Sequence, residues 1–233
     1  GSALGIAGYY PGVLIAGAGT TVDLAGQSMA VAGIMSSGNS FTIANSSGAA
    51  AAWNGNITNS ATGTVTLQTT SGNLAINGAI IQSSGTTSLS IAGTGTTTLA
   101  SSNSTFTGNI TVAENSSLEL ADGGRIIFVI GASGTNNMIG GAGNVSFSGD
   151  FLFNLTGAGT TEGNSWTIVD VSSLNTTGYG GAFEVFGFDN IGSGKWEKNN
   201  FGTTYQFSQA TGQLSVVPEP SALALAAAGG LLL

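Results

Sequence analysis

Carboxylates are the side chains of this sequence that could carry acid–base chemistry. The C-terminal half of the 233-residue chain contains Asp150, Glu162, Asp170, Glu184 and Asp189. Two carboxylates that converge in space can act as the acid and the base of a polysaccharide hydrolase or lyase. These five are isolated from one another in the sequence, and one Arg and two Lys offer little stabilisation for a developing negative charge. We therefore interpret them as solubilising charges and predict that the protein is not an enzyme, with a carbohydrate-active enzyme as the alternative.

Composition excludes several other kinds of chemistry. The chain has no His and no Cys, so it has no His-containing serine triad, no thiol nucleophile and no zinc finger. With a net charge of −8 and 3 Lys+Arg it cannot neutralise a phosphate backbone, so we predict no nucleic-acid partner. A Gly-rich stretch at residues 140–147 is similar to the calcium-binding nonapeptide of β-rolls, but Val145 replaces the metal-binding Asp. We predict no metal and no cofactor.

The pattern of hydrophobic residues indicates short β-strands. The chain is 41% hydrophobic with a mean hydropathy of +0.30, which does not fit generic disorder. Apolar residues alternate with Thr, Ser or Asn in eight short runs, and Gly, Asn or Ser residues bound each run. The runs are residues 21–24, 41–43, 64–67, 73–76, 88–91, 96–99, 109–112 and 117–120. We expect the apolar residues to point inward and the hydroxyl residues outward.

The spacing of these runs leaves two architectures. Between Val65 and Leu120 a new run begins about every 8 to 12 residues, which suits either a sandwich of hairpins or a parallel solenoid with coils of ~20 or more residues. Low charge, small outward residues and only 3 Pro favour the solenoid, whose coils stack on both neighbours. We predict an all-β protein with a parallel β-helix over residues 1–124.

Composition changes near Arg125. The apolar run at residues 125–130 would be buried on both faces, or would lie where the coils end. Longer aromatic strands are expected at residues 147–155, 166–171, 183–188, 205–207 and 214–217. We predict that residues 125–217 form an aromatic-rich β module, which closes the open end of the coils against edge-to-edge aggregation.

One stretch resembles the autotransporter-associated β-strand repeat. Its residues are Leu99, Asn103, Thr105, Phe106, Thr107 and Gly108, followed by Thr111, Val112 and Leu118. The resemblance implies a right-handed parallel β-helix in an exported surface protein. The sequence departs from the family at Asn109, where a second Gly is common.

The C-terminal end resembles a PEP-CTERM sorting signal. Its residues are Val217, Pro218, Glu219, Pro220 and Ser221, followed by the apolar residues 222–233. The two prolines hold this segment extended and accessible. The resemblance implies processing by an exosortase-type machinery and a membrane anchor. Twelve residues of helix span ~18 Å of a ~30 Å hydrocarbon core, so we expect residues 218–233 to be a sorting signal with a truncated transmembrane segment, and an export signal before residue 1.

These observations predict an exported bacterial protein of the cell surface or extracellular matrix. Its role would be structural or adhesive, and the membrane would hold it through a short C-terminal apolar helix. The expected partners are the exosortase-type machinery and exopolysaccharide, which rows of hydroxyl and amide groups would bind through many weak contacts. A third hypothesis, after the enzyme, is the passenger fragment of an autotransporter.

Overall fold

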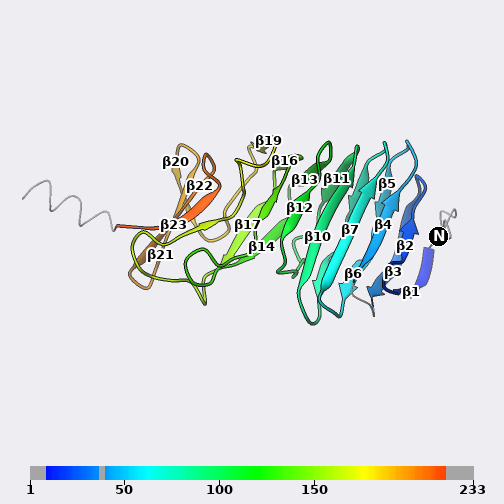
Figure 1. The fold of residues 1–233 in the computed structure, drawn as a ribbon, viewed down its shortest axis with the longest axis horizontal. Helices are drawn as coiled ribbons and strands as arrows, with labels where there is room; N and C mark the ends of the chain where they lie inside the picture. The colour runs from blue at the N-terminus through cyan, green and yellow to red at the C-terminus, as the bar shows by residue number, and fades with distance from the viewer. Residues whose placement is uncertain (1–8, 37–39, 219–233) are drawn as a thin grey trace, which may run out of the picture.

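The protein is an elongated all-β molecule. The computed structural model describes residues 9–36 and 40–218, and these residues form strands and turns without a helix. Figure 1 shows the N-terminal strands at one end of the rod and a separate sheet at the other. The fold class predicted for the described residues is confirmed, whereas the predicted apolar helix at residues 222–233 lies outside them.

Short parallel strands stack into three faces, which together wind through about five turns of a β-solenoid. The first face consists of β2 (Thr21–Asp23), β4 (Phe41–Asn45), β7 (Gly63–Thr69), β10 (Thr87–Gly93), β12 (Ile110–Val112) and β15 (Ile139–Gly141). The second consists of the start of β3 (Ser28–Ser36), β5 (Ala51–Trp53), β8 (Leu74–Ile76), β11 (Thr96–Leu99), β13 (Ser117–Leu120), β16 (Asn144–Phe147) and β19 (Thr176–Tyr179). The third contains β1 (Tyr9–Ala16), the rest of β3, β6 (Asn56–Asn59) and β9 (Ile80–Gln82), and further along the rod β14 (Arg125–Val129) and β17 (Asp150–Asn154).

Strand register defines the length of a turn. Phe41 pairs with Val65, and Val65 pairs with Leu89, so a turn takes 24 residues in this part of the rod. The pairs are parallel, which decides for the solenoid and against a sandwich of hairpins. All eight predicted runs coincide with strands of the first or second face.

A single narrow core fills the solenoid. Val65 and Leu67 are fully buried, while Thr66 between them points outward and is half-buried. The same alternation recurs in each turn and joins the inward residues into one hydrophobic cluster. Most of the inward side chains are aliphatic, and Phe41, Trp53 and Phe106 are larger members of the same cluster.

The parallel stack continues past Arg125. Strand β14 pairs in parallel with β17, and β16 pairs in parallel with β19. The expectation that residues 125–130 are buried on both faces is wrong, because the run alternates: Ile126 and Phe128 are buried, but Val129 is 37% exposed. The predicted domain boundary at residue 125 stays a prediction. The parallel coils continue on both sides of this residue.

Three of the predicted aromatic strands differ from the structure. Residues 166–171 are a strand only as far as Thr167, where β18 (Ser165–Thr167) ends. Residues 147–155 contain the last residue of β16, Phe147, and the whole of β17, because Gly149 makes a corner between these two strands. A Cβ atom on Gly149 would lie 2.3 Å from the carbonyl oxygen of Gly124 in the preceding turn. Residues 183–188 form a loop, in which Val185 makes one isolated bridge to Phe151. The loop is anchored by buried Phe183 and Phe188 and bends at Gly187, whose φ is +75°.

An antiparallel sheet, the cap, covers the C-terminal end of the rod. Its strand order is β18-β23-β22-β21-β20. The strands are β18 (Ser165–Thr167), β20 (Asp189–Gly192), β21 (Lys195–Asn200), β22 (Thr203–Ser208) and β23 (Gln213–Val217). Phe207 of the cap packs against Phe151 and Phe153 of the coils, with ring centroids 5.9 and 5.6 Å apart.

Candidate functional site

The first face carries a column of hydroxyl residues, one from each of five successive turns. The register places them in line, because each member pairs with the next across the parallel ladder. Its members, which we call the hydroxyl column, are Thr21, Thr42, Thr66, Ser90 and Thr111. Neighbouring strands of a sheet are about 4.8 Å apart, so the column presents one hydroxyl per ~4.8 Å along the rod.

These five hydroxyls are available to a ligand. None of them makes a hydrogen bond to another described residue, and all five side chains are half-buried or exposed. The inward neighbours Val22, Ile43 and Ile91 are buried, which holds the backbone of the face in place. Each hydroxyl offers one donor and two acceptor positions and no charge. The column is therefore suited to neutral, hydroxyl-rich polymers.

The residues of the repeat motif divide between the core and the outside of the coil. Buried members hold the core and exposed members lie on the outside of the coil. The buried side chains are Leu99, Phe106, Val112 and Leu118, and the exposed residues are Asn103, Thr105 and Thr111. Of the motif, only Thr111 belongs to the hydroxyl column.

Thr107 and Gly108 fasten one turn of the solenoid to the previous one. The N–H of Gly108 donates to the carbonyl of Thr87 at 2.8 Å. Gln82 Oε1 accepts from the N–H groups of Thr87 at 2.7 Å and Thr107 at 3.1 Å, and its Nε2 donates to the Thr107 hydroxyl at 2.9 Å. Sequence reasoning missed Gln82, because Thr107 lies 25 residues further along the chain, in the next coil.

A buried amide organises the N-terminal turns and was also missed. Asn45 is fully buried, and its Oδ1 accepts from the N–H groups of Gly26 at 2.9 Å and Ser47 at 3.2 Å. Its Nδ2 donates to the carbonyls of Ala49 at 2.8 Å and Asn73 at 2.9 Å. The only signal in the sequence was an Asn at the end of an apolar run, which also fits an ordinary turn residue.

The candidate carboxylates form no acid–base pair with one another in the hydrogen bonds and ion pairs of the described residues. Asp150 Oδ2 lies 2.8 Å from Arg125 Nη2, and the Arg125 guanidinium also lies 4.1 Å from the centre of the Phe186 ring. Asp170 accepts a hydrogen bond from the Ser172 hydroxyl at 2.6 Å, and this bond, together with others from Ser173, lowers the pKa of Asp170.

The three other candidate carboxylates, Glu162, Glu184 and Asp189, are exposed. In residues 9–36 and 40–218, no group of three or more acidic side chains could hold a metal ion.

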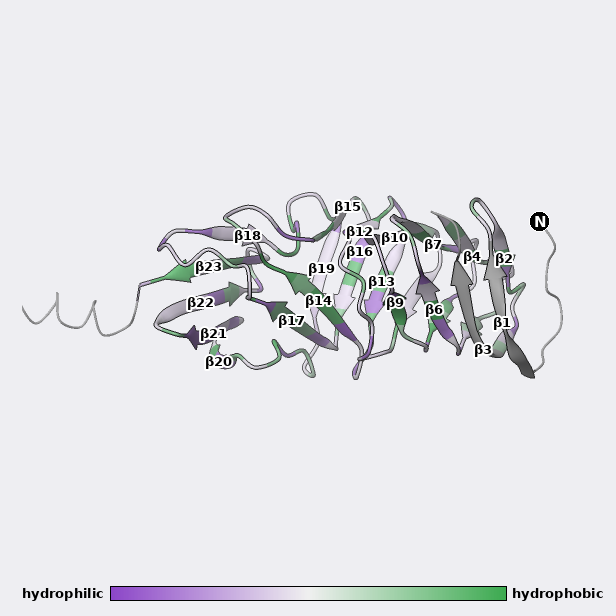
Figure 2. Cartoon of the chain, turned by 90° about the horizontal axis from the view of Figure 1, so that it is seen from below, coloured by the Kyte–Doolittle hydropathy of each residue, from purple (hydrophilic) through white to green (hydrophobic). Residues whose placement is uncertain are grey.

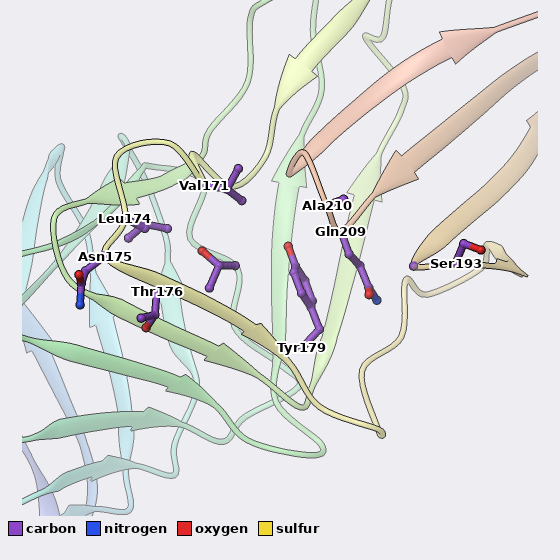
Figure 3. Close-up of a pocket in the computed structure, with 10 residues that line it drawn as sticks. Val171, Leu174, Asn175, Thr176, Tyr179, Ser193, Gln209 and Ala210 are labelled. Carbon is purple, nitrogen blue, oxygen red and sulfur yellow. The ribbon is translucent and has the colours of Figure 1, made fainter.

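A hollow of about 670 Å³ lies between the last coil and the cap. Figure 3 shows Leu174 and β19 on one side and the turns at Ser193 and Gln209 on the other. No charged residue lines it.

Two hydroxyls at this hollow, Thr177 Oγ1 and Tyr179 Oη, are covered from solvent and have no hydrogen-bond partner. Burial raises the pKa of Tyr179, so its phenol stays protonated, and its ring packs against Phe147 and Phe183 with centroids 5.3 and 4.8 Å away. The arrangement favours packing of the end of the coils over catalysis.

The sorting motif starts at the end of the described chain. Val217 is the last residue of β23 and is half-buried, and Pro218 after it is exposed. Glu219, Pro220 and Ser221 lie outside the described residues, as does the apolar run that follows them. Within the described ranges there is no helix long and apolar enough to cross a membrane.

No family model, curated protein or solved structure matches this chain. The geometry defines a capped β-solenoid that carries the hydroxyl column along its first face.

Proposed function

We propose that this protein is an exported, non-enzymatic component of a bacterial cell surface or extracellular matrix, with a structural or adhesive role. The observation that supports the proposal is the hydroxyl column, whose five side-chain hydroxyls make no hydrogen bond to the described residues and are held in register by the parallel ladder. Exopolysaccharide is the proposed ligand, because its sugar hydroxyls pair with such a row of donors and acceptors.

Many weak contacts would give this binding its strength. A neutral hydrogen bond contributes about 0.5–1.5 kcal/mol net, so one contact is too weak to hold a polymer. Contacts along one rod act together, because the first contact raises the effective concentration of the next. The net charge of −8 disfavours acidic polymers, so a neutral glycan is the preferred class.

Sorting and location are part of the same proposal. The segment from Val217 to Ser221 would be read by an exosortase-type machinery, and residues 222–233 would form the start of an apolar helix that anchors the protein before processing. The accessible position of Pro218 after β23 supports recognition by another protein. A right-handed winding of the coils is expected from the strong preference of parallel β connections for that hand.

Binding to neutral polysaccharides tests the role of the hydroxyl column. Thr66→Val combined with Thr111→Val removes two hydroxyls while nearly conserving shape. Losing ~0.7 kcal/mol for each should lower affinity for the polysaccharide roughly tenfold. The measurement is co-sedimentation with insoluble neutral glucans, together with a gel-mobility assay with soluble ones.

Thr58→Val is the matched control, because Thr58 is a half-buried outward Thr on β6 of the third face. Equal weakening by this variant, or unchanged binding by the double variant, would contradict the proposal. Release of reducing or unsaturated sugars from the same panel, lost in Asp150→Asn, would favour the carbohydrate-active enzyme.

A further inference from the structure

The chain leaves the cap beside the turn between β21 and β22. In the cap sheet, Thr204 at the start of β22 pairs with Val217 at the end of β23. Figure 2 shows this turn and the end of β23 at the same extremity of the rod, away from the coils. The turn between β20 and β21 lies at the opposite end of β21, where Ser193 and Gly194 face the hollow beside the last coil.

Phe201 forms the tip of the turn next to the exit. Its side chain is 102% exposed, the highest exposure of any large hydrophobic residue in the described part of the chain. Its φ is +52°, a strained value for a residue with a Cβ, and the turn is closed by a hydrogen bond from the Gly202 N–H to Asn199 Oδ1 at 3.1 Å. A strained position with a fully exposed aromatic ring contributes nothing to the packing of the cap, which points to a contact outside the chain.

The surface beside Phe201 is mixed in character. A hollow of about 470 Å³ beside the turn is lined by Phe153, Leu155 and Phe201 and by polar side chains, Asn154, Thr156 and Asn200. Lys198 also lines it. The tip of the turn thus combines an exposed ring with one cationic side chain close to it.

The sequence after the exit suggests what the ring contacts. Residues 222–233 contain no charged side chain, and only Glu219, Pro220 and Ser221 separate them from Pro218. An extended chain spans at most ~3.5 Å per residue, so Ala222 lies within about 14 Å of Pro218. A bilayer that takes up the apolar residues would therefore lie within reach of the turn.

We propose that Phe201 inserts into the bilayer interface and forms a second membrane contact beside the C-terminal anchor. This inference rests on the membrane anchoring that the proposed function includes. Aromatic side chains are favoured at the membrane–water interface, and a second contact there would orient the rod relative to the bilayer. The hydroxyl column would then project away from the membrane along the rod.

The test places a fluorescent ring at the tip of the turn in the full 233-residue chain. Phe201→Trp adds a Trp to a protein whose other three, Trp53, Trp166 and Trp196, are buried. The protein is floated with phosphatidylcholine vesicles, with and without bromine on the upper acyl chain. We expect a blue shift on binding and bromine quenching at least about twofold stronger than in the control, because the ring lies in the interface.

Ile191→Trp is the matched control, since Ile191 is a 50% exposed residue at the turn that faces the coils. Flotation of the unmodified chain reports on anchoring alone. If the chain floats but the two variants are quenched equally, the inference is wrong while the anchor stands. If the chain does not float, both the anchor and the inference are wrong. A Phe201→Trp emission that responds to neutral glucan and not to lipid would assign the ring to a sugar and overturn the membrane contact.

Discussion

Gly78 shows how closely successive turns of the solenoid approach one another. A Cβ atom at this position would lie 1.8 Å from the carbonyl oxygen of Gly55 in the preceding turn. No side chain can move aside there, because the obstacle is backbone. The requirement for Gly is therefore steric, and it differs from a requirement for positive φ.

We expect Gly78→Ala to lower the free energy of unfolding by ~3 kcal/mol, because the two turns must separate to admit the methyl group. Gly181→Ala is the control, since a Cβ on Gly181 would meet no atom within 4 Å, and it should change stability by less than about 0.5 kcal/mol. Urea denaturation followed by circular dichroism measures both. If the two variants were equally stable, the close approach of the two coils at Gly78 would be contradicted.

Turns of the solenoid are also joined by a carboxylate in the first face. Burial of Asp23, at the end of β2, would by itself raise the pKa of this carboxyl. The carboxylate accepts hydrogen bonds from the Ser46 hydroxyl and from the N–H groups of Ala25 and Ser46, and together these bonds outweigh burial, so the pKa of Asp23 is lowered. A lowered pKa in the folded state means that the charged form stabilises the fold. This contribution is present above the pKa of Asp in the unfolded chain, about 3.9, and is lost as the pH falls through the lower folded value.

Ser46→Ala should therefore flatten the dependence of the melting temperature on pH below about pH 4, because the pKa of Asp23 moves back toward its ordinary value. The melting temperature would be measured by calorimetry from about pH 6 down to about pH 2, with the Asp23 carboxyl followed by NMR. Ser102→Ala, at an exposed loop position, provides the control. A pH profile identical to that of the unmodified protein would contradict the role of Ser46.

Over the whole molecule, the cap and the coils share one hydrophobic core. Phe207 is fully buried and lies between Phe153 of the coils and Phe183 of the loop that joins coils and cap, with ring centroids 5.6 and 6.4 Å away. Tyr179 of the last coil is 6.4 Å from the same ring. The end of the coils is thus covered by aromatic packing, which removes an exposed sheet edge.

Phe207→Ala should cost about 3–5 kcal/mol of unfolding free energy and should promote association of the rods, because it opens the contact between cap and coils. Phe201→Ala is the control, since that ring is fully exposed and its loss should change stability by less than about 0.5 kcal/mol. Urea denaturation and light scattering measure the two effects. Stable, monomeric Phe207→Ala protein would show that the cap is dispensable for covering the coils.

The sequence alone determined eight strands of the first and second faces and the class of fold, whereas β5, β6 and β9 were not among the predicted runs. Alternation of Val65 and Leu67 with Thr64 and Thr66 is local, and burial of every second residue follows from strand geometry. The same reasoning failed at residues 183–188, where aromatic residues anchor a loop into a core that other segments build. The predicted sorting signal and membrane segment stay predictions.

Only the tertiary structure decided which residues lie together. Thr66, Ser90 and Thr111 form a column because the number of residues in each coil brings them into register. That number depends on all the strands and loops of a coil, so no local sequence pattern determines it. The same holds for Asn45, whose partners come from three different parts of the chain, and for Phe201, which lies beside the exit only because β22 pairs with β23. Side-chain alternation is a property of one strand, whereas surfaces and sites depend on pairing between strands far apart in the sequence.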